Sequence, residues 1–104
     1  MNDVIIISPN ISWGYVNKLS EPAIKKLVLD VLKPHQPALP EFATFLSELD
    51  DIFMVDVSLV EMDERTESLK VVLSGDRIDF DKLKEHMVKQ GAVIHSVDQV
   101  LVEK

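Results

Sequence analysis

The chain has 104 residues, the length of one domain, and its 46% hydrophobic and 28% charged residues disfavour disordered, collagen-like and coiled-coil proteins. Against 18 Asp and Glu there are only 11 Lys and Arg, so the charge of −7 disfavours nucleic acid and anionic membrane surfaces as partners. The absence of cysteine excludes disulfides, thiolate catalysis and thiolate metal sites.

Residues 1–22 differ in composition from the rest of the chain, because they contain Trp13, Tyr15 and several turn-forming residues. We expect an N-terminal arm here that packs on the main body or on another subunit; a partly ordered tail is the alternative. The apolar run Val4–Ile7 is too short for a signal-peptide core or a membrane span, and no basic segment precedes it. These features predict a cytoplasmic protein that is not inserted in a membrane.

The regular pattern begins with a predicted strand at 24–32. Apolar residues lie on both faces of this strand, which is typical of a central strand in a sheet. Three prolines then interrupt any ladder, and Pro40 suits the first turn of a helix. Apolar residues at helical spacing predict that this helix spans 40–49.

A hairpin follows the first helix. Its strands are expected at 53–62 and 68–74, joined by the short polar stretch 63–67. Asp79 is a suitable N-cap for a second helix at 80–90, and Gly91 stands where a helix C-terminus often has glycine. A last, strongly β-branched strand is predicted at 92–102.

This element order is βαββαβ, and right-handed crossovers turn it into a ferredoxin-like α+β fold over residues 23–104. We expect an antiparallel sheet with strand order 4-1-3-2 and both helices on one face. The other face then carries a mainly apolar set: Val28, Asp30, Leu32, Met54, Asp56, Ser58, Val60, Met62, Lys70 and Val72. An exposed face of that kind is typical of an interface, so we expect a homo-oligomer that forms through this face or a sheet edge.

Four stretches also carry a family resemblance: residues 27–35, 39–43, 46–49 and 93–98. The most specific is Asp-Val-Leu-Lys-Pro-His at 30–35. Together they resemble the archaeal family catalogued as domain of unknown function 211, over roughly residues 23–102. The resemblance implies a ferredoxin-like fold, an archaeal cytoplasmic setting and homo-oligomers, and it implies no particular activity.

Asp30 is the most informative single residue, because an acid within an apolar central strand is costly unless it is paired or hydrogen-bonded. It could pair with a base such as Lys70 on the neighbouring strand. It could accept hydrogen bonds at a subunit boundary. It could also bind a cation or ligand with help from His95 on the last strand.

His35 lies in the proline-rich loop after the first strand, where a neutral imidazole could bind a metal or a ligand. A loop-capping or solvent-facing histidine is the alternative. The hairpin acids Glu61, Asp63 and Glu64 could hold a hard divalent cation such as calcium or magnesium. They lack the spacing and glycine of an EF-hand loop, so a solvated acidic turn is the competing interpretation.

Taken together, the residues favour a small homo-oligomeric module that binds a small molecule or a divalent cation through Asp30, His35 and His95. A scaffold that binds another chain through its apolar face is the alternative. The chain has no glycine-rich phosphate loop, no His-Glu-x-x-His motif and no serine in a nucleophile elbow, so we assign no catalytic residue. An enzyme that uses Asp30 and a histidine as acid and base is the least favoured reading.

Overall fold

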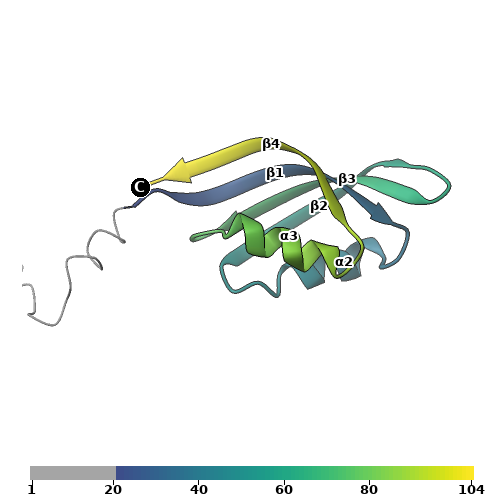
Figure 1. Cartoon of the computed structure of the whole chain (residues 1–104), viewed down its shortest axis with the longest axis horizontal. Helices are drawn as coiled ribbons and strands as arrows, with labels where there is room; N and C mark the ends of the chain where they lie inside the picture. The colour runs from purple at the N-terminus through teal and green to yellow at the C-terminus, as the bar shows by residue number, and fades with distance from the viewer. Residues whose placement is uncertain (1–20) are drawn as a thin grey trace, which may run out of the picture.

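The computed structural model of this chain describes residues 21–104, so most of the expected N-terminal arm lies outside the described residues. The elements are β1 (Ala23–Pro34), α2 (Leu39–Leu46), β2 (Ile52–Met62), β3 (Thr66–Gly75), α3 (Phe80–Val88) and β4 (Val93–Glu103). The sheet order β2-β3-β1-β4 is the predicted order read from the other edge. Both helices lie on one side of the sheet (Figure 1), which confirms the ferredoxin-like α+β fold.

The core forms between the sheet and the two helices because alternate residues of the central strands are apolar. These buried residues are Leu27, Leu29 and Val31 on β1, with Leu69, Val71 and Leu73 on β3. The helices contribute Phe42, Leu46, Leu83 and Met87. Each such side chain removed from water stabilises the fold by about 1.5–3 kcal/mol, and the helix-facing set of β1 is the one predicted.

Both helices end earlier than predicted because their last turns tighten. After Leu46, the backbone N–H of Glu48 donates to the carbonyl of Phe45, three residues back. At the start of α3, Asp79 caps the helix by accepting from the N–H of Lys82 at 3.1 Å. Gly91 has φ of 74°, a left-handed conformation that suits glycine and turns the chain into β4.

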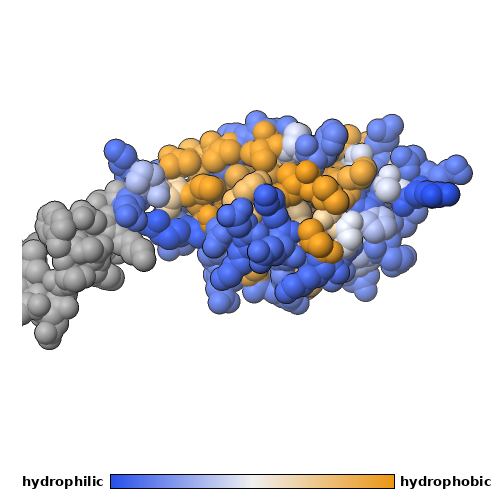
Figure 2. Space-filling model, viewed as in Figure 1, coloured by the Kyte–Doolittle hydropathy of each residue, from blue (hydrophilic) through white to orange (hydrophobic). Residues whose placement is uncertain are grey.

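The strands are much longer than the helices that cover them. Strands of 11–12 residues reach about 36–40 Å, whereas helices of 8–9 residues reach about 12–14 Å. The sheet therefore extends beyond the helices at both ends (Figure 1). Apolar side chains are exposed on its outer parts: Leu59, Val60 and Met62 on β2, with Val97, Val100, Leu101 and Val102 on β4. Figure 2 shows such side chains as a band over β4.

A β-bulge in β2 makes one part of the predicted open face wrong. Between Leu59 and Glu61 the register shifts, so Glu61 lies opposite Ser68 and Met62 lies opposite Glu67. Because facing residues of an antiparallel pair share a face, Met62 lies on the helical side of the sheet and not on the open face. Neither helix in residues 21–104 is long and apolar enough to span a bilayer.

Candidate functional site

The sequence-predicted site residues fall into three places. Asp30 and Glu61 line a groove on the open face of the sheet. His35 lies at the end of the molecule where the β2–β3 hairpin turns, in contact with the backbone of Asp63 and Glu64. His95 is on the edge strand β4.

The open-face groove crosses the sheet and has a volume of about 580 Å³. Its polar lining residues come from all four strands and comprise Asp30, Glu61, Ser68, Lys70, Asp98 and Gln99. The groove therefore holds three carboxylates, one ammonium group, a hydroxyl and an amide. The β2 bulge brings Glu61 to the same face as Asp30, and a second register shift after Val28 makes Asp98 the extra residue of β4.

Asp30 is one of the residues that line this groove. In the sheet it stands opposite Lys70 on one side and Ser96 on the other, so the predicted neighbour relation with Lys70 is correct. The Asp30 side chain is partly buried. Among residues 21–104 it has neither a hydrogen bond nor an ion pair within 4 Å, so the ion pair with Lys70 that the sequence suggested is not formed.

His35 belongs to a different network, on the helix-covered side of the sheet. Lys33 and Glu67 face each other in the β1–β3 register, and Lys33 Nζ lies 3.0 Å from Glu67 Oε1. The Lys33 ammonium also donates to the carbonyl of Pro34 at 2.8 Å, and lies 5.9 Å from the centre of the Phe42 ring. This side chain is fully buried, so its charge depends on these partners.

The ring of His35 is held through both of its nitrogens. Nδ1 lies 3.1 Å from Glu67 Oε2, and Nε2 lies 3.0 and 3.1 Å from the carbonyl oxygens of Asp63 and Glu64. Carbonyl oxygens only accept hydrogen bonds, and so does a carboxylate kept ionised by Lys33. Both contacts are complete only when both ring nitrogens donate, so this arrangement favours the imidazolium form of His35.

The electrostatics of the network agree with this assignment. The hydrogen bond to Glu67, helped by the carbonyl of Glu64, raises the pKa of His35 above its ordinary value. The hydrogen bonds from His35 and then Lys33 lower the pKa of Glu67. His35 thus ties the hairpin turn to the loop between β1 and α2, and both ring nitrogens are occupied by the protein itself.

The hairpin acids are not gathered around one point. Asp63 Oδ1 accepts from the backbone N–H groups of Thr66 and Arg65 and from the Thr66 hydroxyl. These bonds, that from the Thr66 N–H first, lower the pKa of Asp63. Within residues 21–104, no group of three or more His, Asp or Glu side chains is placed to hold a metal ion.

His95 is the extra residue of a second bulge in β4. The partner of Asp30 is Ser96 and the partner of Val31 is Ile94, so His95 has no direct partner on β1 and its side chain is exposed. In the described chain no hydrogen bond joins Asp30 to His95 or to His35. The structure therefore brings Asp30 together with Glu61 and Lys70, and keeps it apart from His35.

Sequence comparisons can now be set beside this geometry. Residues 25–104 match the sequence model of DUF211, described as "Uncharacterized ArCR". The chain belongs to the DUF211 family. One relative, "Uncharacterized protein MJ0319" from the archaeon Methanocaldococcus jannaschii, is 40% identical over 81 residues, which cover 78% of this chain and 84% of the relative.

The DUF211 match begins in β1 and includes the rest of the described chain. It therefore contains every candidate residue named above, in the groove and in the His35 network alike. The resemblance seen in the sequence is confirmed as family membership, and the DUF211 assignment adds no substrate or reaction to the geometry.

Proposed function

We propose that the protein is a small homo-oligomeric, cytoplasmic binding or regulatory module, and that it takes a small ligand in the open-face groove around Asp30. The observation that carries this proposal is the partly buried carboxylate of Asp30, which has no hydrogen bond or ion pair among residues 21–104 and lines a groove of about 580 Å³ on the open face. A carboxylate in such surroundings gains most from a ligand that supplies a positive charge or hydrogen-bond donors.

The groove favours an organic ligand with charges of both signs. Asp30, Glu61 and Asp98 suit an ammonium group, while Lys70 suits a carboxylate or phosphate. The alternative ligand is a divalent cation such as calcium or magnesium. It has less support, because the carboxylates of the described residues do not converge on one point.

The proposed partner is a second copy of this chain. Both edge strands are open in the described chain and carry exposed apolar side chains, among them Phe53 on β2 and Val102 on β4. An uncovered edge of that kind favours strand pairing between subunits. A Val100→Lys substitution on β4 should shift native mass spectra toward monomer, and an unchanged assembly would contradict an interface on this edge.

The same apolar side chains on β4 also favour the alternative function, a scaffold that binds a different chain. The two functions differ in one result. A closed self-assembly that hides β4 leaves no surface for a scaffold partner, whereas a monomer with β4 exposed supports the scaffold.

Ligand binding is tested by isothermal titration calorimetry with free amino acids, which carry both charges, and separately with calcium and magnesium chloride. We expect Asp30→Asn to weaken binding of an amino acid about tenfold, the loss expected for one charged hydrogen bond. The matched control is Asp56→Asn, another acid on the open face that lies opposite Val72 and outside the groove.

Three outcomes separate the alternatives. Binding lost in Asp30→Asn and kept in Asp56→Asn supports the groove. Equal binding by both variants refutes it. If only calcium or magnesium binds, and native mass spectra show a fixed mass lost on chelation, the ligand is a divalent cation and not an amino acid.

A further inference from the structure

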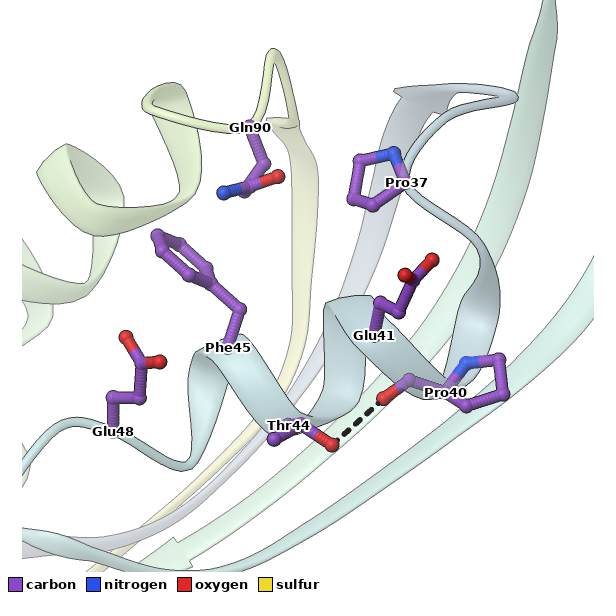
Figure 3. Close-up of a pocket in the computed structure, with 7 residues that line it drawn as sticks. All are labelled: Pro37, Pro40, Glu41, Thr44, Phe45, Glu48 and Gln90. Carbon is purple, nitrogen blue, oxygen red and sulfur yellow. Dashed lines mark hydrogen bonds between the residues drawn. The ribbon is translucent and has the colours of Figure 1, made fainter.

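A second groove lies in the helical layer, between α2 and the turn that follows α3. Its volume is about 480 Å³. Figure 3 shows Glu41, Phe45 and Glu48 rising from α2 and the residues just after it, with Pro37 and Gln90 on the opposite wall. The open-face groove lies across the sheet from it, so the two are separate features.

The spacing of three side chains on α2 and the turn that follows it sets the geometry of this groove. Glu41, Phe45 and Glu48 stand at positions i, i+4 and i+7, which is one side of a helix. At the rise of a helix, the backbone positions of Glu41 and Glu48 lie about 10 Å apart along the axis. The ring of Phe45 lies between the two glutamates, so the floor of the groove presents a carboxylate, an aromatic ring and a second carboxylate in that order.

The ring of Phe45 is fixed in place. It stacks on His86 with the ring centres 3.8 Å apart and the planes 4° from parallel. His86 Nε2 donates to the carbonyl of Phe45 at 2.7 Å, which holds both rings together. One face of the Phe45 ring is therefore covered, and the rest of the ring lines the groove.

The two carboxylates are only partly used by the protein. Glu41 Oε1 accepts from the N–H of Ala38 at 3.2 Å, which caps α2 and leaves the other oxygen for the groove. Glu48 Oε1 lies 3.9 Å from His86 Nε2, whose proton already goes to Phe45. The residues that line this groove include no Lys or Arg, so its charge is negative, as is that of the whole chain.

We propose that this groove binds a linear aliphatic polyamine, with one ammonium group at Glu41, another at Glu48 and the hydrocarbon between them on Phe45 and Pro37. Ammonium groups pair with carboxylates and are attracted to an aromatic ring, and methylene groups gain from contact with apolar surface. The groove is short and built largely on one helix, which suits a small linear polycation better than a folded protein partner.

Calorimetry of the full chain with spermidine tests this proposal. The terminal amines of spermidine are far enough apart to reach both carboxylates, whereas those of 1,4-diaminobutane are too close, so spermidine should bind more tightly. We expect Glu41→Gln and Glu48→Gln each to weaken spermidine binding about twofold to fivefold, and the double variant about tenfold. Phe45→Leu, which keeps the apolar contact and removes the ring, should weaken it about twofold to fivefold.

The substitutions isolate the charge. Gln at position 41 still accepts from the N–H of Ala38, so the helix cap is preserved. Glu103→Gln, at the exposed end of β4, removes the same charge outside the groove and should leave binding unchanged.

Specific outcomes overturn the proposal. If Glu103→Gln weakens spermidine binding as much as Glu41→Gln does, spermidine is attracted by the net negative charge of the chain and not by this groove. If 1,4-diaminobutane binds as tightly as spermidine, the two carboxylates do not act together. If a trilysine peptide binds more tightly than spermidine, the occupant is a basic protein segment.

Discussion

Replacing Glu67 with Gln would leave the Lys33 ammonium in the protein interior with no carboxylate opposite it. Lys33 Nζ lies 3.0 Å from Glu67 Oε1, and its side chain has 0% exposure. At that distance the attraction is on the order of 5 kcal/mol with an effective dielectric constant near 20. Removing water from the two ions offsets most of this, so the intact pair adds little, but a lone buried charge costs about 3–5 kcal/mol.

We expect Glu67→Gln to lower the free energy of unfolding by about 3 kcal/mol, the lower end of that range. The Gln amide oxygen and the Pro34 carbonyl still accept from Lys33, which limits the loss. This loss in the free energy of unfolding is measured by urea unfolding, followed by circular dichroism near pH 6 at one fixed protein concentration.

Two further variants show whether the reasoning is correct. Lys33→Met combined with Glu67→Leu removes both charges and should recover most of the stability. Glu64→Gln removes an exposed acid from the nearby turn and should change stability by less than about 0.5 kcal/mol. A loss below about 1 kcal/mol in Glu67→Gln would show that Lys33 does not depend on this carboxylate.

Other predictions concern pH and two glycines. The raised pKa of His35 gives stability that is complete below pH 6.5 and is lost as the pH rises through that pKa. The lowered pKa of Glu67 gives stability that is present above pH 4.5 and lost as the pH falls through that pKa. The free energy of unfolding, measured by urea titration at a series of pH values, should therefore be highest between pH 4.5 and 6.5. His35→Gln should remove the decline above pH 6.5. A wild-type free energy of unfolding that stays constant above pH 6.5 would contradict this. Gly75→Ala places a Cβ in steric conflict with the Asp51 carbonyl oxygen and should cost about 1–3 kcal/mol, measured by the same unfolding assay. Gly91→Ala should cost about 1–2 kcal/mol because of its positive φ, and an unchanged urea midpoint would be inconsistent with that conformation.

The fold was predictable because hydrophobic periodicity is a local property of the sequence. Alternation in β1 and β3 fixed which residues enter the core, and Asp79 and Gly91 marked the ends of α3. The bulges were not predictable, because an extra residue in β2 or β4 has no compositional signal. For that reason Met62 was placed on the wrong face of the sheet.

The candidate site was predictable in part. The strand order placed Asp30 and Lys70 on neighbouring strands, but the register that puts them opposite each other, and Lys33 opposite Glu67, comes from the structure. Alternation from Leu27 onward also puts Lys33 on the core side, so this signal was present in the sequence and was missed. The partners of His35 include two carbonyls of the hairpin turn, and only the tertiary fold brings them to the ring.

The order of the strands has a consequence for synthesis on the ribosome. β1, at the centre of the sheet, is made before the other described elements, yet it pairs with β4 along residues 93–103, at the far end of the described chain. Until those residues emerge, one side of the central strand exposes unpaired backbone groups beside the apolar surface of the unfinished sheet. The nascent chain can form its β1–β3 and β2–β3 pairs early, but its central strand stays open to wrong partners until residues 93–103 have left the ribosome.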